Sequence, residues 1–164
     1  MNFRAIKLAG VLLASPLALA PLAAEEAITT MSSEDSKDGM VTRSVHFAGA
    51  CGDECLLASI TCGGSPRLEV ELMDIPAEEA AKSIAQEQSE LMLAASGQTY
   101  KLPITNFGYT EMNGSWDASA YGPDPDAVFK SLAKAKKFTL SVKGRSEALP
   151  VTADVRAWAE ACLK

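Results

Sequence analysis

Histidine and aromatic residues are scarce in this chain of 164 residues, which holds one histidine, two tryptophans and three tyrosines. The single His46 excludes any mechanism that needs two imidazoles, and a serine nucleophile would have to use this residue as its base. The sequence also lacks a Gly-x-Ser-x-Gly elbow, a phosphate loop, a dinucleotide fingerprint and a calcium loop. Because no complete catalytic constellation can be assembled, we predict that the protein is not an enzyme and carries no cofactor.

Basic residues are also in the minority, with 15 lysines and arginines against 21 aspartates and glutamates. An acidic chain without a basic stripe binds nucleic acids poorly, and anionic lipid surfaces repel it. We therefore expect no nucleic-acid partner.

Residues 1–24 have the pattern of an export signal. Arg4 and Lys7 precede an apolar run over residues 8–20, and small residues then lead to Ala24. The run is too short and too interrupted for a stable membrane span. We predict cleavage near Ala24, a periplasmic location with an extracellular one as the alternative, and no stable membrane span afterwards.

Beyond the signal, residues 25–42 are polar and aperiodic, which predicts a flexible leader. We expect residues 43–164 to form a single globular domain of the α+β class, an antiparallel, sandwich-like sheet with about three helices, held by disulfides. Residues 91–95 fit a helix or a strand equally well. The expected strands cover residues 44–48, 55–62, 68–72, 99–109, 114–121 and 138–142, and the helices begin at Pro76, at Asp124 or Asp126, and at Thr152 or Asp154.

The chain has four cysteines, which an export signal would carry to a compartment where disulfides persist. Cys62 shares a strand face with apolar residues, and Cys162 falls on the apolar face of the last helix, so both thiols point toward the core. We predict a Cys62–Cys162 disulfide, which leaves Cys51 to pair with Cys55. The competing pairing, Cys51–Cys62 with Cys55–Cys162, stays open.

A different interpretation of the Cys51-x3-Cys55 segment is a thiol-based copper, zinc or redox carrier, since His46 lies five residues upstream. The spacing is not the Cys-x-x-Cys of thioredoxin-like enzymes. The intervening Asp53 and Glu54 would raise the pKa of both thiols, which does not favour reactive thiolates. We therefore prefer a structural disulfide and keep the carrier as the alternative.

Glu69 and Glu71 alternate with apolar residues, which predicts that both carboxylates share one face of a strand. A solvated strand face shows this alternation more often than a glycosidase pair does. Tyr100, Tyr109 and Tyr121 fall in the middle strands. We predict that these tyrosines form a candidate binding face, since aromatic residues on a sheet combine apolar area with polar groups.

The segment from Phe129 to Gly144 passes from a helix or turn into a strand that ends near glycine, and Trp158–Cys162 places a cysteine on a late helix. This pattern resembles the C-terminal part of small proteobacterial periplasmic proteins, namely the invasion-associated locus B family and the type VI secretion-associated VasI-like proteins. The resemblance covers about the last third of the chain and implies a β-rich, non-catalytic envelope protein. The chain departs from these families in the alanine- and glutamate-rich helix expected over Ala77–Gln88.

Together these features predict a non-enzymatic exported accessory or binding module that acts on an envelope protein or a small ligand.

Overall fold

The computed structural model describes residues 28–37, 39–50, 55–64, 67–78, 90–110, 115–142 and 145–164. Two helices lie wholly within these residues, and the fold is mostly β. The strands are β1 (Thr29–Lys37), β2 (Met40–Ala48), β3 (Leu56–Cys62), β4 (Leu68–Pro76), β5 (Glu90–Ala95), β6 (Gln98–Thr110), β7 (Ser115–Tyr121), β8 (Lys137–Val142) and β9 (Arg145–Pro150), and the helices are α2 (Pro125–Lys134) and α3 (Ala153–Cys162).

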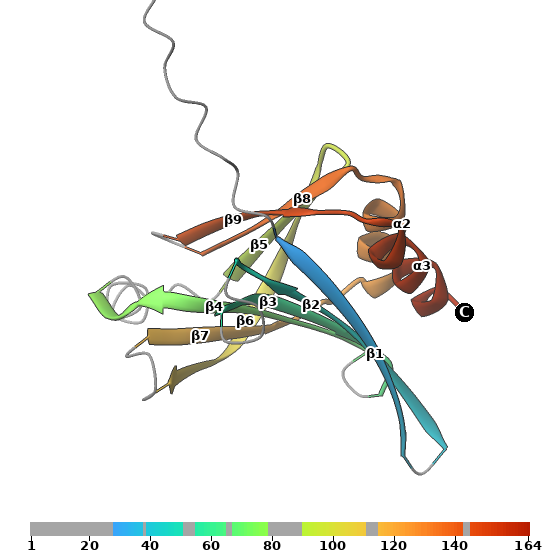
Figure 1. Cartoon of the computed structure of the whole chain (residues 1–164), viewed down its shortest axis with the longest axis horizontal. Coiled ribbons are helices and arrows are strands. Elements are labelled where there is room, and N and C mark those ends of the chain that lie inside the picture. The colour runs from blue at the N-terminus through green and yellow to red at the C-terminus, as the bar shows by residue number, and fades with distance from the viewer. Residues whose placement is uncertain are drawn as a thin grey trace, which may run out of the picture.

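All nine strands form one sheet in the order β1-β2-β3-β4-β7-β6-β5-β8-β9, and each neighbouring pair is antiparallel. The sheet curls strongly, so that β8 and β9 lie above β2, β3 and β4 (Figure 1). The ring centroids of Phe47 on β2 and Phe138 on β8 are 5.3 Å apart across the core. Register shifts next to Phe47, Leu72 and Ile104 bend the strands where the sheet turns.

The predicted antiparallel sheet is confirmed, but the described residues form a mostly β fold with two helices, and the prediction of a sandwich-like α+β domain with about three helices differs from it in two respects. One curled sheet replaces the two packed layers of a sandwich, because alternating side chains predict strands without saying whether the sheet curls. Pro76, predicted to open a helix, is the last residue of β4. Ala77 and Glu78 follow in helical conformation, and the rest of that predicted helix lies outside the described residues.

Each of the two helices begins at the first of the two capping residues that the sequence offers. The Asp124 carboxylate accepts a hydrogen bond from the Ala127 N–H at 3.2 Å, and the Thr152 hydroxyl accepts one from the Val155 N–H at 3.3 Å. Both are N-caps, which satisfy backbone donors that the first turn leaves unpaired. α2 and α3 lie side by side at one end of the curled sheet (Figure 1), and Phe129 packs edge-on against Trp158 between them.

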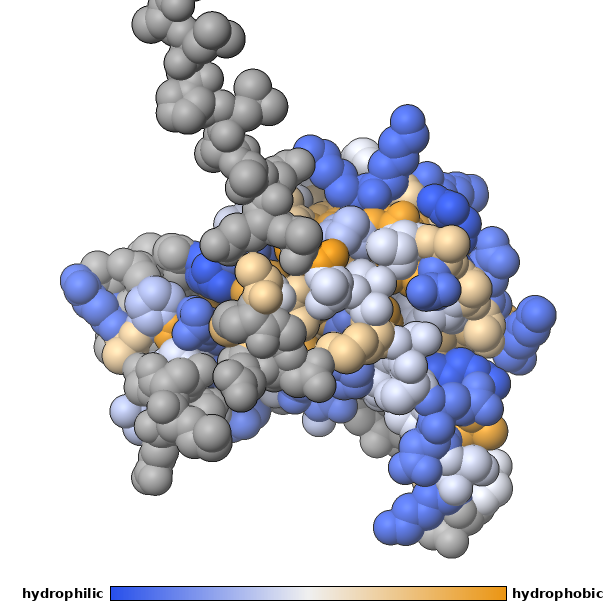
Figure 2. All heavy atoms as spheres, in the orientation of Figure 1, coloured by the Kyte–Doolittle hydropathy of each residue, from blue (hydrophilic) through white to orange (hydrophobic). Residues whose placement is uncertain are grey.

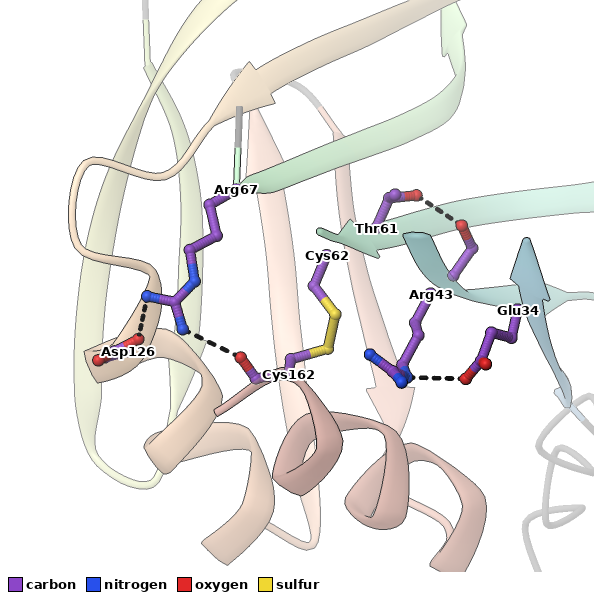
Figure 3. Close-up of a disulfide and its surroundings, with 8 residues drawn as sticks. Glu34, Arg43, Thr61, Cys62, Arg67, Asp126 and Cys162 are labelled. Carbon is purple, nitrogen blue, oxygen red and sulfur yellow. Dashed lines mark hydrogen bonds and ion pairs between the residues drawn. A yellow bond between two sulfur atoms is a disulfide. The ribbon is translucent and has the colours of Figure 1, made fainter. Parts of the chain in front are cut away.

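The Cys62–Cys162 disulfide is present as predicted and joins β3 to the end of α3, with a Cα–Cα distance of 5.9 Å. Arg67 strengthens the same junction, because its guanidinium lies between the two helices (Figure 3). Nη2 donates to the Cys162 carbonyl at 3.1 Å, and Nη1 lies 2.8 Å from the carboxylate of Asp126. The C-terminal end of α3 is therefore fixed by one covalent bond and one arginine.

The largest departure from the sequence prediction is the flexible leader over residues 25–42. Residues 29–37 form β1, and residues 40–42 are the first part of β2. Almost every side chain of β1 is exposed, so the strand shows no apolar alternation and is held by backbone pairing with β2. Residues 91–95, which the sequence leaves open, belong to β5, and β9 has no sequence prediction at all.

Within the described ranges, no helix combines the length and the apolar character that crossing a membrane requires.

Candidate functional site

A groove lies between the β1–β2 hairpin and α3. Its volume is about 360 Å³, and it is lined by Ser32, Ser33, Glu34, Arg43, Asp154, Ala157, Trp158 and Ala161. The four α3 residues fall at i, i+3, i+4 and i+7, which places them on one helix face. Ala157 and Ala161 are small, and they leave space opposite the serines of β1.

Both ends of the groove are fixed. Thr30 and Thr152 join β1 to the beginning of α3 through their hydroxyl groups, which are 3.2 Å apart. At the other end, Arg43 lies directly opposite Cys62 in the β2–β3 register, next to the disulfide that holds the end of α3. The groove is therefore preformed by contacts between residues that are far apart in the sequence.

The groove has a slightly negative lining. Arg43 pairs with Glu34, with Nε and Oε2 2.9 Å apart, and Asp154 adds a second carboxylate (Figure 3 shows the Arg43–Glu34 pair). Trp158 is 5% exposed, and its buried indole N–H has no hydrogen-bond partner among the residues that the structure describes. An unpaired buried donor is rare, because desolvation without a partner is costly.

β1 is an edge strand beside this groove. It pairs with β2 on one side, and no other described strand lies along its second edge. The β1–β2 hairpin projects beyond the body of the protein (Figure 1), and Figure 2 shows this projection as mostly hydrophilic. Backbone N–H and C=O groups along a free edge are open to another strand.

A row of polar side chains crosses the opposite face of the sheet. His46, Ser59, Glu71 and Ser119 lie opposite one another on β2, β3, β4 and β7. The Ser59 hydroxyl donates to Glu71 Oε2 at 2.8 Å, and the Ser119 hydroxyl donates to Glu71 Oε1 at 3.4 Å. Ser59 therefore donates its hydrogen bond to the Glu71 carboxylate rather than to the His46 imidazole, and this bond stabilises the negative charge of Glu71.

Glu69 shares this face with Glu71, as the alternation predicts. Partial burial, followed by the charge of Glu71, raises the pKa of the Glu69 carboxyl above its ordinary value of 4.5.

The structure does not bring the three predicted tyrosines onto one face. Tyr100 and Tyr109 are nine residues apart on β6, about 30 Å along an extended strand. Tyr100 turns toward α2, and Tyr109 packs on Trp116 with ring centroids 5.4 Å apart. Tyr121 pairs with Glu69 in the β4–β7 register, so the two side chains share the face of the sheet that points away from the core.

For the predicted carrier, the structure places His46 on β2, opposite Ser59. Cys55 is disulfide-bonded, and a disulfide sulfur is not a thiolate ligand. Cys51 lies outside the described residues, so its predicted link to Cys55 stays a prediction. Among the residues that the structure describes, no three histidine, cysteine or acidic side chains are grouped in a way that could hold a metal ion.

The groove itself has no sequence prediction. Trp158 is buried on the same face of α3 as Cys162, but its exposed neighbours on β1 fall within the predicted leader, residues 25–42. The signal available in the sequence was the pair Ala157 and Ala161, small residues one turn apart on the helix.

Comparison of this chain with protein-family models, with curated proteins and with solved structures finds no match.

Proposed function

We propose that this protein is a non-enzymatic, exported binding module that receives an extended segment of an envelope protein as an additional strand on β1. The observation that carries this proposal is the free edge of β1 beside a preformed groove. In this binding mode, backbone hydrogen bonds to the edge supply affinity, and the side chains that point into a neighbouring groove supply specificity.

The geometry suits that mode. Glu34 lies opposite Arg43 on the face that α3 covers, so alternate residues of an added strand would point toward α3. The Ala157 and Ala161 side chains leave room there for the side chains of an added strand. The single positive charge of Arg43 is outnumbered by Glu34 and Asp154, which favours a neutral or basic segment over an acidic one.

Export is part of the proposal and rests on two features. Residues 1–24 have the pattern of a signal sequence, and the Cys62–Cys162 disulfide suits an oxidising compartment such as the periplasm. A non-enzymatic role is supported by the polar row, where Ser59 and Ser119 donate to the same carboxylate of Glu71.

The test begins with a photo-crosslinking amino acid at Ser33 of β1 in the exported protein, with Ser146 of β9 as the matched position on the opposite edge. Mass spectrometry of the crosslinked product identifies the partner segment. A synthetic peptide of that segment is then titrated into a Trp116→Phe variant, in which Trp158 is the remaining indole and reports on the groove. We expect saturable binding that changes the Trp158 emission.

Two proline variants decide whether the edge is the binding element. Ser32 and Ser33 are neighbours on β1, so their N–H groups point to opposite edges of the strand. The variants are Ser32→Pro and Ser33→Pro. In one of them proline removes a backbone N–H that points to the free edge, and in the other it removes a backbone N–H that bonds to β2. The variant that loses the N–H on the free edge should bind the peptide about tenfold more weakly and keep its normal stability. The variant that loses the bond to β2 should be less stable. Equal crosslinking from Ser146, or full affinity in both variants, would refute the proposal.

The alternative function, a copper, zinc or redox carrier that uses His46, Cys51 and Cys55, is tested by a free-thiol count and metal analysis on the exported protein. Free thiols at Cys51 and Cys55, or metal released with them, would support the carrier. Four paired cysteines without metal would exclude it. Cys55 is disulfide-bonded in the structure, which favours the binding module.

A further inference from the structure

A second hollow lies on the other helix, between the β5–β6 turn and α2. Its volume is about 360 Å³, and it is lined by Ser96, Gln98, Tyr100, Ala127, Lys130, Ser131 and Lys134. The lining holds two lysines, three hydroxyl groups and one amide, and it contains no carboxylate. This composition stands out in a chain whose net charge is −6.

A network of hydroxyl groups fixes the floor of this hollow. The Tyr100 hydroxyl donates to the Ala127 carbonyl at 3.0 Å and also contacts the Ser131 hydroxyl. Ser131 is 7% exposed, so a buried polar side chain lies at the base of the site. Gln98 reaches the same phenol, with its side-chain oxygen 2.6 Å away.

The turn that forms the opposite wall is held in an uncommon conformation. Ser96 and Gly97 both have positive φ, 50° and 77°, as a two-residue hairpin turn between β5 and β6 requires. The Ser96 hydroxyl donates to the Ser131 carbonyl at 2.9 Å, which attaches the turn to α2. The walls are therefore set before any ligand arrives, and this lowers the ordering cost of binding.

Two lysines at the rim of the hollow could bind an anion. Lys130 and Lys134 lie one helical turn apart on α2, both side chains are exposed, and neither forms an ion pair with a described carboxylate. Two like charges at this spacing repel each other, and an anion placed between them removes that repulsion. Both lysines line the hollow together with Gln98, whereas the hydroxyl groups of Tyr100 and Ser96 donate within its floor and wall.

We propose that this hollow binds the phosphoryl group of a small polar ligand. Lysine is a common phosphate ligand, two of them match a doubly charged group, and the polar floor suits the hydroxyl-bearing part of a phosphate monoester. The acidic chain as a whole disfavours an anionic membrane surface, so we favour a soluble ligand over a lipid headgroup. The site is separate from the β1 groove and does not depend on the function proposed there.

The test uses the exported protein labelled with ¹⁵N, titrated at constant ionic strength with inorganic phosphate, glycerol 3-phosphate and, as the reference anion, chloride. We expect saturable shifts of the amides of residues 96–98 and 130–134 with both phosphates and none with chloride. Vesicles of phosphatidylglycerol form a separate arm. Shifts with the soluble monoester support the site as proposed, whereas binding to vesicles alone would overturn the soluble ligand.

Charge variants separate a built site from a general charge effect. Lys130→Gln and Lys134→Gln should each weaken glycerol 3-phosphate binding about tenfold, the loss of one charge-assisted contact. Lys136→Gln is the matched control, since this exposed lysine follows α2 without lining the hollow. Tyr100→Phe keeps the charges, removes the phenol, and should weaken binding severalfold. Equal losses in Lys136→Gln and the two rim variants, or linear shifts without saturation, would overturn the proposal.

Discussion

β9 and β1 are the two edge strands of the sheet, and they differ in length, composition and exposure. β9 has six residues and ends in Pro150, and its Arg145 and Glu147 side chains form an ion pair of 2.7 Å in which both are about one-fifth exposed. β1 has nine residues and no proline, and nearly all of its side chains are exposed.

Sheets avoid unwanted pairing by short edge strands, by proline and by charges that lie on the edge. β9 has all three of these features. β1 is longer and has serines at its centre, and its charged residues lie toward the hairpin tip. The same sheet therefore has one protected edge and one open edge, and the open edge lies beside the groove. This difference is the reason to look for a partner at β1 rather than at β9.

The largest effect is expected from the Cys62→Ser/Cys162→Ser double variant, which removes the bond between β3 and α3. The bond closes a loop of about 100 residues, and its removal should lower the free energy of unfolding by about 4–5 kcal/mol. Guanidinium unfolding measures this loss. Because α3 forms one wall of the groove, amide exchange in β1 and α3 should become faster, whereas exchange in β9 should change little.

Cys51→Ser/Cys55→Ser is the matched control, since a predicted loop this short constrains the unfolded chain less. Equal losses in the two double variants would contradict the view that the Cys62–Cys162 bond is the main constraint on α3.

The next largest change in stability is expected when the ion pairs at the two edges of the sheet are broken. Glu147→Ala leaves the Arg145 guanidinium partly buried without its partner, and should lower the free energy of unfolding by about 1–2 kcal/mol. Glu34→Ala breaks the pair between Glu34 on β1 and Arg43 on β2, whose side chains are 58% and 32% exposed. This variant should change the free energy of unfolding by less than about 1 kcal/mol. Thermal and urea unfolding of both variants would show this order. The reverse order would mean that β1 is the better protected edge.

The same contrast explains how far the sequence predicts the fold. The N-caps could be narrowed to Asp124 or Asp126 and to Thr152 or Asp154, and Cys62 and Cys162 could be predicted as partners, because each prediction rests on local chemistry or on the apolar face of an element. β1 and β9 could not be identified in this way, because neither shows an apolar alternation: the side chains of β1 are almost all exposed, and β9 is short and mostly polar.

The groove was beyond sequence reasoning for a different reason. It depends on contacts such as Thr30 with Thr152, which are 122 residues apart, and on a curl that local periodicity does not encode. Tyr100 shows the same limit. Its residue type suggested a binding role, but its neighbours in the hollow come from the β5–β6 turn and α2 rather than from the other tyrosines.

The smallest effect is expected in the middle of the sheet, away from both edges. The pKa of Glu69 is raised by partial burial and by Glu71, so the folded protein binds this proton more tightly than the unfolded chain. Stability is therefore lost as the pH rises from the ordinary value of 4.5 through the raised pKa, and is regained as the pH falls. Glu69→Gln removes this dependence.

At neutral pH, Glu69→Gln should raise the free energy of unfolding by no more than about 0.5 kcal/mol, since solvent still screens a carboxylate that is only partly buried. Urea unfolding at pH 7 and at pH 4 should show the gain at the higher pH and little difference at the lower one. Glu71→Gln is the control with the opposite sign, because it weakens the hydrogen bonds from Ser59 and Ser119. A loss of stability in Glu69→Gln at pH 7 would mean that this carboxylate has an attractive partner, and that the centre of the sheet, like β9, is held by charge.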